Sequence, residues 1–443
     1  MKVTRTYHMA DGSMSPVSGR FIQMDAANEG EAAWKELRAS ADLIYLDPPL
    51  FADEAAPISQ RLGPAGYSNG RERVKLANEK DAFSGTMEAY VAFMRAVLLR
   101  ARECLKPTGC LYLHCASNVN AHLRLLMDEV FGADKFQNEI VWHYKSGGRA
   151  RNFFARRHDT ILFYRKSRKP FFDPEAAGEK RGMQKRNNLR RTVDETGRVY
   201  FSLVTAGKEY RYYEDETVLP GDVWLDISAL QQRDPERTGH PTQKPLALLE
   251  RIVQVSCPPD GLVMDFFSGS GTTALAAANT GRRFVAVDCA PLARQVLRRR
   301  LWEHGFDVET QGPSPQSRAQ LSVCRHTSAQ EMDVWVQGYA PDEQGAPYRG
   351  AEPVESQMTL RQSLAMTGEA GQTDGCPPNA DLYMLDMVAA GRWKDGVFTV
   401  HDRVLRTLRH PALQPLLTIG PGPGTPCIQT VDCMGTATCF LIE

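Results

Sequence analysis

The chain has 443 residues, of which 42% are hydrophobic and 24% charged, a composition ordinary for a globular protein of about two to three domains. No apolar run reaches the roughly 20 residues of a membrane helix, and the polar N-terminal stretch has no signal-peptide core. Lys and Arg balance Asp and Glu at 53 each, and ten cysteines in this length make no disulfide scaffold, so we expect a cytoplasmic protein with reduced thiols.

The first half alternates predicted strands and helices. Residues 42–46 form a short apolar run that Asp47 and Pro48 end, which is typical of a buried parallel strand. Apolar residues at helical spacing predict a helix over residues 87–105. The later predicted elements are a strand at 110–114, a helix over 121–131 and strands at 139–142 and 160–164. This order is typical of an α/β domain.

A basic segment follows, and its Gly and Pro residues predict irregular structure to about Asp234. Residues 145–198 hold 16 Lys and Arg against 6 Asp and Glu, an excess of ten positive charges in a chain whose formal charge is zero. A basic patch on an otherwise acidic protein favours nucleic-acid binding. A solvated loop is the alternative reading of the same charges.

The second half resumes the α/β pattern. Its predicted elements are a helix over 246–255, a strand at 262–265, a glycine loop, a helix over 272–279 and a strand at 284–287. Residues 312–380 are rich in Pro, Gly, Gln and Ser, which predicts a linker, and strand-like runs return near residues 396–400. Cys427, Cys433 and Cys439 are spaced unlike zinc ligands, so we expect no metal site.

The glycine loop, which includes Gly269 and Gly271, lies between a predicted strand and a predicted helix. There the backbone N–H groups can approach a ligand at the helix N-terminus, and glycine removes the Cβ atoms that would block the approach. The next strand ends at Asp288, an acid placed to accept hydrogen bonds from ribose, although a helix cap or a surface acid is the alternative. Neither a third glycine nor a phosphate-binding lysine follows, which favours a nucleoside cofactor without pyrophosphate, such as S-adenosylmethionine.

Asp47, Pro48 and Pro49 form a rigid corner at the end of the first buried strand. The lone pair of an exocyclic amine on a base is delocalised into the ring, so the amine is a poor nucleophile. The carboxylate of Asp47 and the carbonyl of Pro48 could accept its two N–H groups and localise that pair. Taken alone, the same three residues are also compatible with a simple turn.

Together, these features resemble the N6-adenine/N4-cytosine DNA amino-methyltransferases, in the permuted beta-class order that puts the catalytic motif before the cofactor loop. Asp47 precedes Asp265 by 218 residues, with the basic segment between them. The resemblance covers about residues 20–300. It includes the segment from His240 to Pro245 and four shorter stretches: Met24-Asp25-Ala26, Lys106-Pro107-Thr108-Gly109, Asn138-Glu139-Ile140-Val141-Trp142 and Leu246-Ala247-Leu248-Leu249-Glu250-Arg251.

The resemblance implies roles for individual residues. The catalytic motif is Asp47, Pro48, Pro49 and Leu50, with the first two at the target amine. The residues implied around S-adenosylmethionine are Asp25, Ala26, Asp47, Thr242, Lys244, Pro245, Asp265, Phe266, Phe267, Ser268, Gly269, Ser270, Gly271, Thr273 and Asp288. Two residues depart from the family: Leu50 replaces an aromatic that stacks on the target base, for which Phe51 is a candidate substitute, and Phe266 replaces a proline, with an expected effect on loop rigidity alone.

The expected fold is therefore a Rossmann-like, circularly permuted methyltransferase fold. Residues 1–144 would form the catalytic half, 145–236 the basic target-recognition region, 237–311 the cofactor half, and 312–443 a linker with a small C-terminal domain of unknown role. The expected function is N6-adenine methylation of double-stranded DNA by base flipping. N4-cytosine methylation and a DNA-binding protein with a degraded site are the alternatives.

The expected partners follow from the same reading. DNA contacts are predicted between about residues 145 and 233, with phosphate contacts supplying affinity and base contacts supplying specificity. The resemblance adds a homodimer and a restriction endonuclease partner as expectations. The candidate DNA-binding residues are Arg149, Arg151, Arg186, Asn187, Asn188 and Arg190.

Overall fold

The computed structural model describes residues 7–8, 14–15, 19–28, 31–52, 57–61, 73–80, 82–145, 151–176, 178–180, 190–231, 234–238, 240, 242–306, 308–311, 320–327, 332–340, 385–394, 397–405, 416–432 and 437–441. Within this part of the chain, none of the helices has the length and apolar character that crossing a membrane requires.

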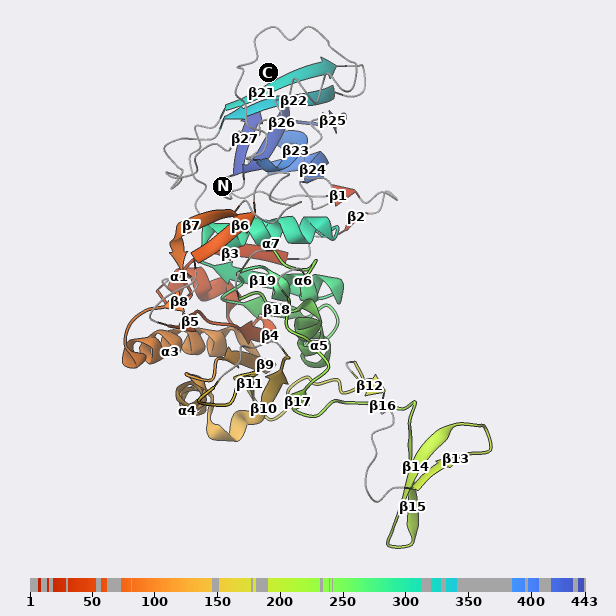
Figure 1. Ribbon diagram of the computed structural model, residues 1–443. Helices are drawn as coiled ribbons and strands as arrows, with labels where there is room; N and C mark the ends of the chain where they lie inside the picture. Colours follow the sequence, from red (N-terminus) through yellow and green to blue (C-terminus); the bar gives the residue numbers. More distant parts are fainter. Residues whose placement is uncertain are drawn as a thin grey trace.

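A nine-stranded sheet forms the centre of the molecule (Figure 1). All its neighbouring strands pair in parallel except around β11, which runs against both β9 and β10. In spatial order the strands are β17 (Val223–Trp224), β10 (Phe136–His143), β11 (His158–Arg165), β9 (Leu105–Cys115), β4 (Ala41–Leu46), β18 (Leu262–Asp265), β19 (Arg283–Asp288), β3 (Gly19–Gln23) and β20 (Glu309–Gln311).

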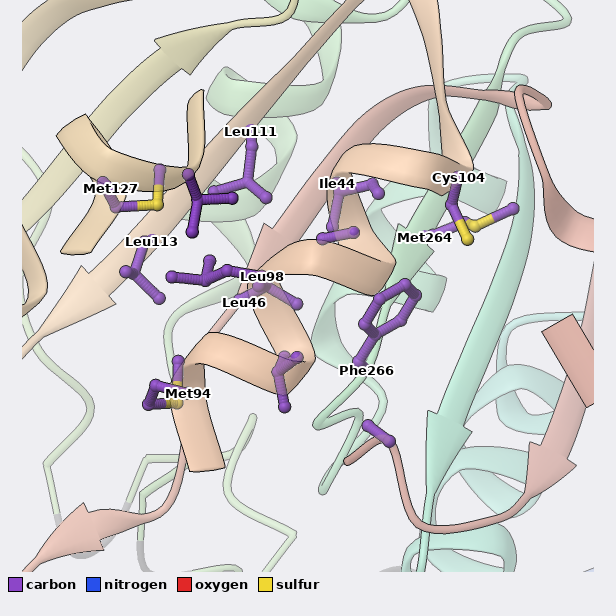
Figure 2. Close-up of a cluster of buried hydrophobic side chains, with 14 of the residues drawn as sticks. Ile44, Leu46, Met94, Leu98, Cys104, Leu111, Leu113, Met127, Met264 and Phe266 are labelled. Carbon is purple, nitrogen blue, oxygen red and sulfur yellow. The ribbon is translucent and has the colours of Figure 1, made fainter. Parts of the chain in front are cut away.

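Helices cover both faces of this sheet, because successive strand residues point to opposite sides. Figure 2 shows Ile44 and Leu46 of β4 in one core cluster with residues of the helix α3 (Met87–Cys104) and of α4 (Asn120–Phe131). Leu43 and Tyr45 point to the other cluster, to which three further helices contribute. These helices are α5 (Leu246–Ser256), α6 (Thr272–Asn279) and α7 (Pro291–Glu303).

The centre of the sheet joins the two halves of the sequence. Strand β4 pairs with β18 in parallel, and Asp265 lies in register with Tyr45. This arrangement confirms the expected Rossmann-like α/β fold with its permuted order. The predicted strands at 42–46 and 262–265 and the helix at 272–279 are also confirmed.

The structure corrects two expectations for the first 236 residues. The helix expected to reach residue 105 ends at Cys104, and β9 begins at Leu105, because Leu105 already pairs with Ala41 of β4. The basic segment is not irregular throughout. It contains a three-stranded antiparallel sheet of β13 (Arg190–Val193), β14 (Val199–Thr205) and β15 (Lys208–Tyr213), which projects away from the central sheet in Figure 1.

Two strands within residues 145–236, β11 and β17, belong to the central sheet. Between these two strands, residues 166–222 contain the three-stranded sheet of β13, β14 and β15. This range also holds the short pair β12 (Glu179–Lys180) and β16 (Thr217–Val218).

The C-terminal part contains two further sheets. Strands β21 (Gln320–Thr327) and β22 (Met332–Ala340) form within the stretch expected to be a linker, and they pair with β25 (Leu416–Ile419). The other sheet holds β24 (Val397–Leu405), β23 (Leu385–Lys394), β26 (Thr425–Asp432) and β27 (Ala437–Leu441).

The remaining short elements are β1 (Tyr7–His8), β2 (Met14–Ser15), α1 (Glu31–Trp34), η1 (Lys35–Leu37), β5 (Leu50–Phe51), β6 (Pro57–Arg61), β7 (Arg73–Lys80), β8 (Ala82–Phe83) and η2 (Ala133–Lys135).

Candidate active site and cofactor pocket

A cavity of about 470 Å³ lies at the carboxyl ends of β4 and β18. This volume is within the roughly 300–1,000 Å³ typical of small-molecule sites. Because the two strands are parallel neighbours, Asp47 and the glycine loop after Asp265 lie at the same edge of the sheet. Of the sequence-predicted site residues, those that line this cavity are Asp25, Ala26, Asp47, Pro49, Thr242, Lys244, Asp265, Phe266, Phe267, Ser268, Gly269, Ser270, Thr273 and Asp288.

Four predicted site residues are not among the residues that line this cavity. Pro48 is buried, and Leu50 is 43% exposed. Pro245 is the residue that precedes α5 and accepts a hydrogen bond from the N–H of Leu248 (3.2 Å). Gly271 has φ +74°, and a Cβ atom there would lie 2.9 Å from Cα of Leu297. The packing of α7 thus requires glycine at position 271.

Asp47 is held by an ion pair with Lys244, whose ammonium donates to Oδ2 of the carboxylate. The same ammonium donates to the carbonyl of Thr242 (3.3 Å). Both side chains are largely buried, with 20% and 13% of their surface exposed. The carbonyl of Pro49, the residue next to Pro48, accepts a hydrogen bond from the hydroxyl of Tyr90 (3.3 Å). These contacts fix the turn that follows β4.

Asp265 is an acid of the cavity wall whose pKa is raised. Burial raises the pKa of Asp265 to about 7, and the charges of Asp47 and Asp288 act in the same direction. Hydrogen bonds from Thr273 and from the N–H of Phe267 (2.9 Å) lower the pKa but do not outweigh burial. Near neutral pH this carboxyl group is therefore about half protonated.

Asp288 shapes the glycine loop from the end of the neighbouring strand. Its Oδ2 accepts the N–H of Gly269 (2.8 Å), and its Oδ1 accepts the N–H of Ala290 (2.9 Å). Both carboxylate oxygens of Asp288 are thus engaged with backbone N–H groups. Asp288 therefore both holds the turn and faces the cavity.

A buried arginine connects the glycine loop to the segment before α5. Arg300 of α7 donates to Oγ1 of Thr272 (2.7 Å) and to the carboxylate of Glu236 (2.8 Å). Glu236 in turn accepts the N–H of Leu246 (2.9 Å). No sequence motif predicts this pair, because its two members are 64 positions apart.

Aromatic side chains form the wall beside Asp47. Phe83 and Phe93 line the cavity and pack against each other, with ring centroids 5.4 Å apart. Phe51, the expected substitute for the missing aromatic, does not line the cavity and packs on Tyr90 at 5.4 Å. Sequence reasoning missed Phe83, and it assigned Phe93 only to helix packing. It also missed Tyr45, which lines the same cavity. His240, which lines it too, begins the segment that the resemblance to the family places beside the cofactor.

Phe266 is a core residue. It is 1% exposed, and its ring meets that of Trp34 edge-on at 4.8 Å. The replacement of the family's proline thus contributes an aromatic contact to the core as well as any effect on the loop.

Of the candidate DNA-binding residues, Arg151 and Arg190 are exposed. The other four, Arg149, Arg186, Asn187 and Asn188, lie outside the described residues.

The cavity fits S-adenosylmethionine. Oγ of Ser268 is buried in the cavity wall and has no hydrogen-bond partner among the described atoms. Buried hydroxyl groups are normally hydrogen-bonded, so a bound ligand would supply the partner. A Cβ atom on Gly269 would lie 3.2 Å from the imidazole of His240, so only glycine lets the turn lie this close to the cavity wall. Four acids that line the cavity (Asp25, Asp47, Asp265 and Asp288) can accept hydrogen bonds and attract a cation.

Comparisons with known proteins agree with this site. The model of the DNA methylase family of N6 and N4 methyltransferases matches residues 41–295. The type II methyltransferase M.EcaI of Enterobacter cloacae is 27% identical over 308 residues, which cover 59% of this chain and 64% of that protein. The chain thus spans less than two thirds of that relative's length. The DNA adenine methyltransferase YhdJ of Escherichia coli K12 is 26% identical over 258 residues, 56% of this chain and 72% of YhdJ.

Among solved structures, the M1.HpyAVI–SAM complex aligns with a TM-score of 0.39 at 18% identity, over 64% of this chain and 98% of that one. The family match covers more than half of the chain and includes both Asp47 and the glycine loop. Methylases of this family use S-adenosylmethionine as methyl donor. The chain therefore belongs to the N6/N4 family of DNA methylases.

Proposed function

We propose that this chain transfers a methyl group from S-adenosylmethionine to the N6 amino group of adenine in duplex DNA. The observation that carries the proposal is that Asp47 and the turn at Ser268 and Gly269 line one cavity. Two points favour adenine over cytosine: the family usually has an acid at position 47 in its adenine-specific members, and the relative YhdJ is named a DNA adenine methyltransferase.

In the proposed reaction, the carboxylate of Asp47, which lines the cavity, accepts one N–H group of the target amine. The resemblance to the family assigns the other N–H group to the carbonyl of Pro48, the adjacent residue, although Pro48 is not among the residues that line the cavity. Acceptance of both N–H groups localises the lone pair of the nitrogen and aims it across the cavity. Lys244 donates to Oδ2 of Asp47, so the other carboxylate oxygen is the one presented to the amine. Bound S-adenosylmethionine supplies an electrophilic methyl group. Positioning by the rigid turn contributes most of the rate.

The cofactor would be held by residues from both halves of the chain. Oγ of Ser268 and the carboxylate of Asp265 would bind its methionine part, and Asp288 its ribose. Asp25 and Ala26, on the loop after β3, would contact its adenine ring. The carboxylates attract the cation, and the buried walls exclude water.

DNA reaches this site only if the target nucleotide leaves the base stack, because its amine is inaccessible inside a duplex. The basic segment would hold the phosphates, with Arg151 and Arg190 among its exposed cations. A homodimer and a restriction endonuclease partner also belong to the proposal. Sedimentation of the purified protein and co-purification from its native host test these two points.

The proposed activity is tested by incubating the protein with duplex DNA of mixed sequence and labelled S-adenosylmethionine, then separating the nucleosides. Label in N6-methyladenine supports the proposal. Label in N4-methylcytosine overturns the choice of base, and cofactor binding without any transfer overturns the enzymatic function.

A further inference from the structure

The connection between β10 and β11 lies at the sheet edge that carries Asp47. Strand β10 is antiparallel to β11, and β11 is antiparallel to β9, which is parallel to β4. Strand β10 therefore runs in the same direction as β4, and its carboxyl end at His143 lies at the same edge of the sheet. The loop that follows therefore begins at the sheet edge that carries Asp47.

Two adjacent phenylalanines on this loop are turned to solvent. Phe154 is 97% exposed and Phe153 is 65% exposed. An exposed aromatic pair adds little to the core and is available for contact with a partner. Phe153 is covered in part by the guanidinium of Arg156, 5.7 Å from its ring centroid. Phe154 is thus the more accessible of the two rings.

The charge of the loop identifies the partner. Residues 145–157 contain five Lys or Arg and no Asp or Glu. The guanidinium groups of Arg151, Arg156 and Arg157 lie on exposed residues beside the two phenylalanines. An apolar pocket on a protein partner would not explain five cations beside the aromatic pair. A DNA backbone does explain them, because Lys and Arg side chains neutralise the phosphates on both sides of a base step. Aromatic rings interleaved with cations are typical of surfaces that contact nucleic-acid bases.

Hydrogen-bonded side chains tie the base of the loop to the cavity wall. The N–H of Tyr144 donates to the carbonyl of Arg157 (2.9 Å), and its hydroxyl donates to Asp159 (3.2 Å). Nε2 of His114 lies 3.0 Å from the other oxygen of Asp159, and Nδ1 lies 2.9 Å from the hydroxyl of Tyr45, which lines the cavity. The loop is therefore fixed at its base relative to the site, while Phe153 and Phe154 are exposed.

We propose that Phe154 is a wedge that enters the DNA base stack and fills the gap left by the extruded target nucleotide. Apolar side chains inserted between base steps are an established way to hold a duplex in an unstacked state. The cations on both sides of Phe154 hold the adjacent phosphates. This role rests on the proposed function, because it assumes that the protein extrudes a base.

The test compares the wild-type protein, Phe154→Ala and Leu125→Ala in binding two labelled 25-base-pair duplexes of the same sequence, one intact and one with a central abasic site. Leu125, on α4, is a matched control, since it is also an apolar side chain that is largely exposed (71%). Fluorescence anisotropy gives the dissociation constants. A wedge prefers a gap that already exists, so we expect wild-type protein to bind the abasic duplex about tenfold more tightly.

Phe154→Ala should lose most of this preference, and Leu125→Ala should keep it. The proposal is overturned if Phe154→Ala keeps the wild-type preference, or if the wild-type protein shows none. Circular dichroism of each variant checks the fold. Methyl transfer by the wild-type protein is measured on the same preparation, so that loss of the proposed function and loss of the wedge are separate results.

Discussion

The ammonium of Lys244 donates a hydrogen bond to Oδ2 of Asp47, although the two residues are 197 positions apart in the chain. Asp47 follows β4 in the first half, and Lys244 precedes α5 in the second. The pair thus joins the two halves of the molecule at the proposed reaction centre. It also leaves the carboxylate with one oxygen committed to the protein.

Lys244→Met removes this partner, and we predict that it slows methyl transfer at saturating cofactor by about ten- to hundredfold, the value of a charge-assisted hydrogen bond. The affinity for S-adenosylmethionine should not weaken, because the variant removes a cation from a pocket that binds a cation. Single-turnover rates and calorimetric titration measure the two quantities. A weaker cofactor affinity with an unchanged rate would instead make Lys244 a cofactor ligand alone.

The raised pKa of Asp265 predicts that cofactor binding depends on pH. Burial raises this pKa from 3.8 to about 7, and a cationic ligand prefers the ionised form. Affinity for S-adenosylmethionine should therefore increase between pH 6 and pH 8, by up to about tenfold. Calorimetric titration across this range measures the change. Asp265→Asn should bind more weakly at pH 8 and show a flat profile, and an equally steep profile in this variant would contradict the assignment.

The same shift fixes the sign of a stability effect. In the unfolded chain Asp265 ionises near 3.8, whereas in the folded protein it keeps its proton to about 7. The folded state thus binds more protons within this range, and its stability should fall as the pH rises from about 4 to about 7. Denaturant unfolding gives the free energy of unfolding of the wild-type protein and of Asp265→Asn at several pH values. The contribution of Asp265 is the difference between the slopes of the two free energies against pH.

Gly271 and Gly281 have nearly the same backbone conformation but different surroundings, so alanine at the two positions separates backbone strain from overpacking. Their φ angles are +74° and +72°, but a Cβ atom on Gly281 would meet nothing within 4 Å, whereas one on Gly271 would meet Leu297. Gly281→Ala should cost about 1–2 kcal/mol from the left-handed backbone alone. Gly271→Ala should cost a further 1–3 kcal/mol, roughly, from overpacking. Equal losses in denaturant unfolding would show that α7 moves aside freely.

Phe83 and Phe51 have different predicted roles: Phe83 contacts the target base, and Phe51 only packs in the interior. Both rings contact Tyr90, at 5.3 Å and 5.4 Å, but of the two only Phe83 lines the cavity. We predict that Phe83→Ala raises the KM for DNA by about tenfold, because an aromatic that stacks on a base contributes about 1–3 kcal/mol. Phe51→Ala should reduce thermal stability and leave the KM for DNA unchanged. Steady-state kinetics at varied DNA concentration measure the KM for DNA of both variants.

Much of the fold could be predicted because its strands and helices have strong local patterns. The run at 42–46 is buried at every position, and the glycine loop sits between a clear strand and a clear helix. Parallel pairing then places both at one sheet edge, as the motifs required. The sheet of β13, β14 and β15 could not be predicted, because Arg190, Arg191 and Lys208 to Arg211 are exposed and give no apolar alternation.

The site residues that belong to a sequence motif could be predicted. The site residues that only tertiary contacts bring to the cavity could not. Asp47, Ser268 and Asp288 line the cavity as expected. Arg300 and Phe83 come from segments without a motif, and Gly271 serves the packing of α7, which no local pattern reveals. These positions depend on long-range packing, which the sequence does not specify locally.

The proposed role of Asp47 is tested most directly by Asp47→Ala, with methyl transfer measured in a single turnover at saturating cofactor and DNA. We predict a loss of at least about 10²-fold in rate, because the target amine loses its charged acceptor. The affinity of the variant for S-adenosylmethionine should change by no more than a few fold. A variant that transfers methyl groups at the wild-type rate would contradict the role of Asp47 and with it the account of the site.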